Sequence, residues 1–60
     1  MNFIKLNERN KGSIFINMNN VIYMEAINVE EWRAKTIIHT LSKESLYVKE
    51  TIDEITKLIK

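Results

Sequence analysis

The sequence has no cysteine, no proline and a single glycine, Gly12, among its 60 residues. Without cysteine the chain can form no disulfide, no thiolate metal site and no thiol nucleophile. With one glycine it can hold neither the dinucleotide-binding fingerprint nor the Walker phosphate loop, because both need several glycines. These absences exclude thiol chemistry and nucleotide-dependent catalysis, and we expect no bound cofactor.

A charge excess and a long apolar run are also missing. Nine lysine and arginine residues stand against eight acidic residues, for a formal net charge of +1, which gives no long-range field toward phosphate backbones or anionic lipids. No stretch approaches the ~20 apolar residues of a membrane span, and residues 1–6 do not resemble a signal peptide. We therefore expect a cytoplasmic protein that does not insert into membranes.

The composition that remains is that of a globular chain, 45% hydrophobic with charged residues spread throughout. Sixty residues make a single domain, 1–60, near the lower size limit for a chain that folds alone. At this size a disulfide, a metal or a partner subunit usually adds the missing stability. Because the disulfide is excluded, we expect a homo-oligomer, with a different protein as the other possible partner.

Short runs of alternating apolar residues predict five β-strands separated by polar turns. The predicted strands are 3–6, 13–17, 21–28, 34–41 and 45–49. The third is rich in β-forming residues and is expected to be central in the sheet. The predicted fold class is α+β, with a small antiparallel, meander-like sheet of five strands and one C-terminal helix.

The apolar period changes in the C-terminal segment, where Ile52, Ile55 and Ile59 recur at helical spacing. Thr51 and Glu54 have the spacing of a capping box, in which each side chain bonds a backbone amide of the other residue. The segment from Thr51 is therefore predicted to be a helix packed on one face of the sheet. A helix of about ten residues is only ~15 Å long, so it leaves the other face uncovered.

The two faces of each predicted strand differ in composition. The aliphatic side, assigned to the helix, comprises Ile4, Leu6, Ile14, Ile16, Ile22, Met24, Ala26, Leu46 and Val48. The opposite side is aromatic, and with Trp32 from the loop at 29–33 its candidate interface residues are Phe3, Phe15, Tyr23, Ile27, Trp32 and Tyr47. Such a patch is large for a monomer and predicts self-association or a protein partner, unless the sheet curls and buries both faces.

Few residues could carry chemistry. His39 is the sole imidazole and could meet Glu25 or Asp53, but a lone histidine gives no metal-ligand spacing. Neither Ser42 nor Ser45 is flanked by the glycines of a nucleophile elbow. We therefore predict no catalytic residue, no metal site and a non-enzymatic function.

Nucleic-acid binding is the alternative function. Lys5, Lys35 and Lys49 could place cations around aromatic residues that stack on bases. The glycine-aromatic signature of an RNA-recognition motif is missing, however, and a net charge near zero favours packing of the aromatic residues at a subunit interface.

Five short segments follow one another through most of the chain and lead into Ile52, Asp53, Glu54 and Ile55. They are Ile4-Lys5-Leu6, Ile16-Asn17, Val21-Ile22-Tyr23-Met24-Glu25, Thr36-Ile37-Ile38 and Tyr47-Val48-Lys49-Glu50. In order and length this pattern resembles the small flagellar and swarming-motility proteins of the FlbD-like type. The sequence has Ser42-Lys43-Glu44-Ser45 where that family usually has a glycine in the last hairpin. The resemblance implies a non-enzymatic protein linked to flagellar function.

The segment Asn20-Val21-Ile22-Tyr23-Met24-Glu25-Ala26, followed by predicted strands and then a helix, carries a second resemblance. It is similar to the first part of the LytTR-type DNA-binding domains of bacterial response regulators. That likeness implies a regulatory module that binds nucleic acid. Both resemblances imply a bacterial β-rich module, and they bear on the fold more than on the function.

Overall fold

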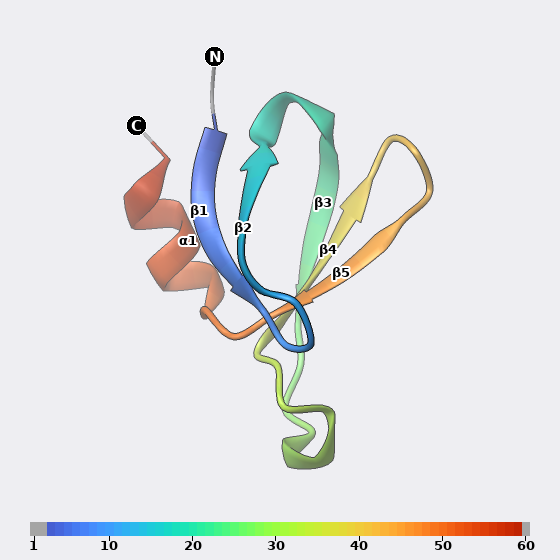
Figure 1. Cartoon of the computed structure of the whole chain (residues 1–60), viewed down its shortest axis with the longest axis vertical. Coiled ribbons are helices and arrows are strands. Elements are labelled where there is room, and N and C mark those ends of the chain that lie inside the picture. Colours follow the sequence, from blue (N-terminus) through green and yellow to red (C-terminus); the bar gives the residue numbers. More distant parts are fainter. Residues whose placement is uncertain (1–2, 60) are drawn as a thin grey trace.

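The computed structural model describes residues 3–59, which form one sheet, two short 3-10 helices and one α-helix (Figure 1). In chain order the elements are β1 (Phe3–Glu8), β2 (Gly12–Asn17), η1 (Met18–Asn20), β3 (Val21–Ala26), η2 (Glu30–Trp32), β4 (Thr36–Thr40), β5 (Ser45–Val48) and α1 (Ile52–Leu58). The predicted α+β class, with a five-stranded antiparallel sheet and a C-terminal helix, is confirmed. All five predicted strands are present, and none of their ends is shifted by more than two residues.

The strand order in the sheet is β2-β1-β5-β4-β3. The last three strands of the chain form a meander, and the β1–β2 hairpin joins it through β1, which lies beside β5. The prediction that β3 is central is wrong, because β3 is one edge of the sheet and β2 is the other. Strand order depends on contacts between distant segments, and the β-propensity of a single strand does not encode it.

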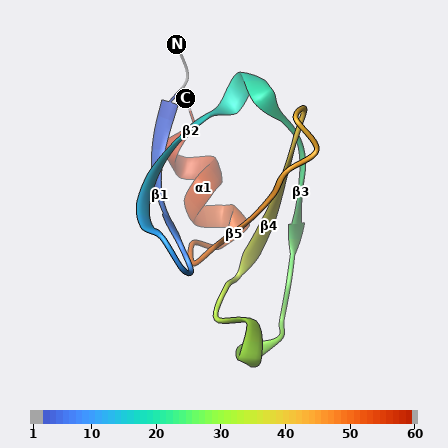
Figure 2. The same cartoon turned by 45° about the vertical axis from the view of Figure 1, so that its right-hand side comes forward.

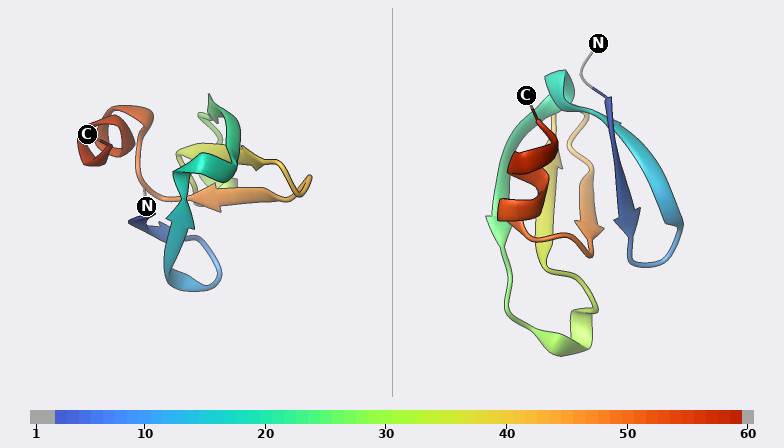
Figure 3. Two further views of the ribbon diagram at one scale, coloured as in Figure 1. Left: turned by 90° about the horizontal axis from the view of Figure 1, so that it is seen from above. Right: turned by 90° about the vertical axis from the view of Figure 1, so that its left-hand side faces the viewer.

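The two parts of the sheet meet at a short junction. Glu8 opposite Val48 is the register pair between β1 and β5. It is flanked by a 2.9 Å hydrogen bond from Arg9 N to Tyr47 O and a 2.8 Å bond from Lys49 N to the Asn7 carbonyl. The β1–β2 hairpin and the meander diverge from this junction, and α1 lies beside the opening between them (Figure 2). Figure 3 shows the helix on one side of the sheet.

Helix α1 begins where the sequence predicts. The Thr51 hydroxyl accepts a 3.2 Å hydrogen bond from Glu54 N, and Thr51 N donates a 3.0 Å bond to Glu54 Oε1, so the capping box is confirmed. The bond from Thr51 N to the carboxylate, and next the Thr51 hydroxyl beside it, hold the pKa of Glu54 below its usual value. The segment before the helix is tied to the sheet through Glu50. Its carboxylate accepts a 2.8 Å bond from the Asn7 amide, and its carbonyl accepts a 2.7 Å bond from the Thr36 hydroxyl.

The core lies between the inner face of the sheet and Ile55, which is fully buried. Its buried cluster is Ile4, Leu6, Ile16, Ile38, Val48 and Ile55, against which Ile14, Met18, Val21, Met24 and Leu46 pack. The aliphatic side is therefore as predicted in β1, β2 and β5. In β3 the prediction is wrong for Ile22 and Ala26, which are exposed. A shift of register between Val21 and Tyr23 places a bulge at Ile22, so that Val21 packs on the core in its stead.

A buried carboxylate fixes the turn between β1 and β2. Glu8 Oε1 accepts hydrogen bonds from the backbone N–H groups of Asn10 and Lys11, both at 2.7 Å. Burial by itself raises the pKa of Glu8, but the two backbone hydrogen bonds and the charges of Lys11 and Arg9 outweigh it, so the pKa lies below its ordinary value of 4.5. The fold thus favours the ionised form of this side chain.

Because the folded-state pKa of Glu8 is lowered, its contribution to stability is complete above its ordinary pKa of 4.5 and is lost as the pH falls through the folded-state value. We expect Glu8→Gln to lower the free energy of unfolding at neutral pH and to flatten its decline on acidification. Urea unfolding followed from neutral pH to about pH 3 measures both effects. An equally steep decline in the variant would contradict the role assigned to the Glu8 carboxylate.

Candidate interaction surfaces

Large apolar side chains remain exposed on several elements of the described chain. They are Phe3, Phe15, Ile22, Tyr23, Trp32, Leu41, Leu58 and Ile59. Of the residues predicted to form the interface, four of the five aromatic ones are therefore exposed, whereas Tyr47 and Ile27 are half-buried. Contiguous exposed apolar patches mark sites that bind another protein, whereas single exposed apolar residues are normal, so the grouping of these side chains decides which of them are candidates.

Phe3 and Phe15 lie on the outer face of the β1–β2 hairpin. In the strand register Phe15 is opposite Lys5 and Phe3 is opposite Asn17. Phe15 is 72% exposed, the largest fraction among the exposed apolar side chains. Because β2 is an edge strand, this phenylalanine stands at one open edge of the sheet.

Tyr23 stands near the opposite edge, on β3. Its ring stacks on His39 with a centroid distance of 4.3 Å and an interplanar angle of 15°. His39 Nε2 lies 2.6 Å from Glu25 Oε1, so Glu25 is the carboxylate that reaches this histidine. Ser45 is opposite His39 in the register, but no hydrogen bond joins their side chains among the described residues. Phe15 and Tyr23 of the predicted aromatic face therefore stand at opposite edges of the sheet.

Between the two edges, a third cluster holds the connection from β3 to β4. The Arg9 guanidinium carbon lies 4.1 Å from the centroid of the Tyr47 ring, and Arg9 Nη1 donates a 3.0 Å hydrogen bond to Trp32 O. Trp32 meets Tyr47 edge to face, with centroids 5.9 Å apart. Trp32 and Tyr47 are thus brought together as a clamp on the connection. The sequence reasoning missed Arg9, since no spacing relates it to a residue 23 positions away.

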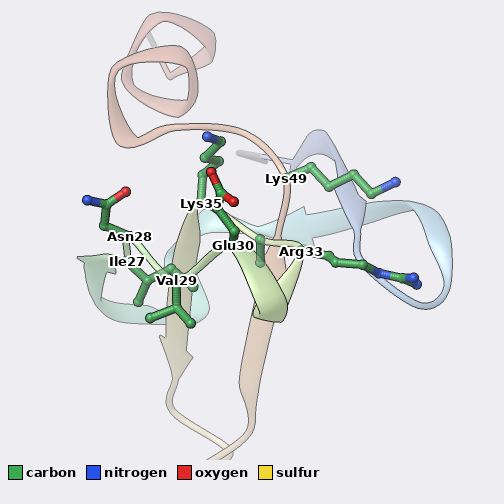
Figure 4. A pocket seen from close by; sticks show the side chains of 8 residues that line it. Ile27, Asn28, Val29, Glu30, Arg33, Lys35 and Lys49 are labelled. Carbon is green, nitrogen blue, oxygen red and sulfur yellow. The ribbon is translucent and has the colours of Figure 1, made fainter.

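A pocket of about 310 Å³, open to solvent, lies against the same connection (Figure 4). It is lined by Ile27, Asn28, Val29, Glu30, Arg33, Ala34, Lys35 and Lys49. Two of the predicted nucleic-acid contacts, Lys35 and Lys49, meet at this pocket, whereas Lys5 lies opposite Phe15 on the hairpin. The structure adds Arg33, whose side chain extends to the same side as Lys49 in Figure 4.

A second pocket, of about 270 Å³, lies between β2 and the turn that joins β4 to β5. It is lined by Lys11, Ile14, Phe15, Ile16, Asn17, Asn20, Thr40, Ser42, Glu44 and Leu46. Side chains of consecutive residues in a strand point to opposite faces of the sheet. Residues of β2 from both faces line this pocket. The pocket therefore borders the open edge of β2.

Neither a search for metal ligands nor comparison with known proteins identifies a further site in the described part of the chain. Among residues 3–59, no group of three histidine, aspartate or glutamate side chains is placed to hold a metal ion, and no helix has the length and apolarity to cross a membrane. The chain matches no family model, no curated protein and no solved structure. The candidate surfaces are therefore defined by geometry alone.

We expect Arg9→Ala to loosen the connection around Trp32. The change removes a cation–π contact and a hydrogen bond from a charged donor, and it should lower the free energy of unfolding by about 1–2 kcal/mol. Because Trp32 is the sole tryptophan, acrylamide quenching of its fluorescence should increase in the folded variant. Arg33→Ala, in the same connection but outside the clamp, is the matched control. Unchanged quenching in Arg9→Ala would contradict the clamp.

Proposed function

We propose that this protein is a non-catalytic interaction module that self-associates or binds a protein partner through its exposed apolar surface. The observation that carries the proposal is the exposure of aromatic side chains at both open edges of the sheet, with Phe15 at β2 and Tyr23 at β3. Edge strands offer unpaired backbone groups, and aromatic residues are the side chains most enriched at protein interfaces.

The size of the chain supports the same function. Small domains bury a low fraction of their surface, and their stability is correspondingly marginal. The accessible surface is 4509 Å², so an interface of roughly 800 Å² per partner would cover nearly a fifth of it. A partner that binds only the folded chain stabilises it by mass action.

We expect the mass in solution to rise above the 7.1 kDa of one chain with concentration. Light scattering and sedimentation equilibrium over a concentration series measure this, and the temperature of unfolding should rise in parallel because association stabilises the folded state. A mass that stays at 7.1 kDa, together with an unfolding temperature independent of concentration, would rule out self-association.

Nucleic-acid binding is the second candidate function, and the pocket around Arg33, Lys35 and Lys49 is the observation in its favour. Binding of a fluorescent single-stranded oligonucleotide should then weaken steeply with salt, because phosphate contacts release counterions. Lys49→Glu should weaken binding further, whereas Lys43→Glu, in the β4–β5 turn away from the pocket, should change it less. The absence of binding at low salt would remove this candidate.

The resemblance to FlbD-like proteins adds a biological process to the proposal, which is flagellar function. An interaction module fits that process, because the resemblance implies a protein without enzymatic activity. The two proposals are separable, since self-association is a property of the purified chain and motility is a property of the cell.

A further inference from the structure

We propose that the open edge of β2 is the self-association surface, and that two copies of the chain join by antiparallel pairing of β2 with β2. This inference rests on the proposed function and names its partner, a second copy of this chain, and its contact. The pairing would merge two five-stranded sheets into one continuous sheet across the dimer axis.

The hydrogen bonds of β1 show which backbone groups of β2 are available. Asn7 and Arg9 direct their backbone groups toward β5, as their bonds to Lys49 and Tyr47 show. Because backbone groups alternate in direction along a strand, the residues of β1 that alternate with these two direct theirs toward β2. The residues of β2 opposite them are Gly12, Ile14 and Ile16. The remaining residues of β2, which are Ser13, Phe15 and Asn17, direct their N–H groups to the open edge, and Ser13 and Phe15 direct their C=O groups there as well. Asn17 is the N-cap of η1, so its C=O accepts the first hydrogen bond of that helix.

The sequence of β2 is complementary to itself in one antiparallel register. With Phe15 opposite Phe15 of the second copy, Ser13 is opposite Asn17 on the outer face. On the inner face, Ile14 is then opposite Ile16. Polar residues meet polar ones and apolar residues meet apolar ones. Phe15 faces Phe15 of the second copy and can exchange two hydrogen bonds with it, and the C=O of each Ser13 can accept one from the N–H of the opposed Asn17.

The two edges of the sheet differ in their protection against such pairing. Edge strands are commonly guarded by charged residues, prolines or bulges. The β3 edge carries the charged Glu25 and the bulge at Ile22. The β2 segment, Gly-Ser-Ile-Phe-Ile-Asn, has no charge and no proline, and its register with β1 is unbroken from Gly12 to Asn17. The geometry therefore favours β2 as the edge that pairs.

The pocket beside β2 leaves this side of the β2 edge uncovered. One wall of the pocket is β2, and the other includes Thr40, Ser42 and Leu46 from β4, β5 and the turn between them. A strand paired with β2 would lay the inner-facing Ile14 of the second copy at this pocket. Ile14 is half-buried in the monomer and would thereby gain apolar contacts, whereas Ile16 is already buried in the core.

A charge placed on each edge in turn tests the surface. Phe15→Lys should return the mass to 7.1 kDa at concentrations where the native chain associates, because a lysine at the paired edge opposes its copy. Tyr23→Lys, the matched change on β3, should leave the mass of the assembly unchanged. Circular dichroism establishes that each variant is folded before the masses are compared.

Disulfide trapping tests the register without altering Phe15. The chain has no native cysteine, and opposed residues of a hydrogen-bonded antiparallel pair lie about 5.5 Å apart at Cα, within disulfide range. Ser13→Cys mixed with Asn17→Cys should form a cross-linked dimer on mild oxidation. Each variant alone should cross-link far less, because identical positions other than 15 are offset from one another.

The outcomes separate this inference from the function on which it rests. A native chain that is monomeric at every concentration overturns both the self-association and the β2 pairing. A native chain that associates, but is dissociated by Tyr23→Lys and not by Phe15→Lys, overturns the β2 pairing alone. Cross-linking of Ser13→Cys with itself as efficiently as with Asn17→Cys overturns the register.

Discussion

The junction between β1 and β5 is the contact on which the rest of the fold depends. It consists of the pair Glu8 and Val48 with one backbone hydrogen bond on each side, reinforced by the hydrogen bonds between Asn7 and Glu50. Because the pairing is so short, the β1–β2 hairpin can bend away from the meander while both inner faces still close on Ile55. Val48 is fully buried, so opening the junction would expose the core and undock the helix together.

The short helix sets what the fold can cover. At seven residues α1 is about 10 Å long, whereas a six-residue strand extends about 20 Å. Curvature of the sheet compensates on the inner side, where Leu6, Ile38 and Val48 are fully buried. On the outer side the middle of the sheet is covered, because Arg9 and Trp32 pack on Tyr47, but the region at β2 is open and leaves Phe15 exposed. The exposure of Phe15 and of other apolar residues is therefore a consequence of the architecture.

The sequence predicts those features of the fold that depend on neighbouring residues. The capping box at Thr51 and the strand positions rest on local spacing, and both are found. The contact between Glu25 and His39 can also be predicted from the sequence, because consecutive strands commonly form hairpins. The position of β3, the face of Ile22 and the clamp formed by Arg9 cannot be predicted in this way. They depend on strand order, on a one-residue bulge that reverses the faces of a strand, and on a contact between distant segments.

The bulge at Ile22 connects the failed face assignment with the difference between the two edges. One extra residue turns Ile22 outward and also interrupts the regular edge that β3 would otherwise present. At β2 there is no such interruption, and three of its six residues are isoleucine or phenylalanine. An unguarded edge of this kind exposes a small protein to aggregation unless a defined partner occupies it. Because β2 pairs with β1 alone among the described strands, a strand paired along its free edge would also stabilise the hairpin that closes the core.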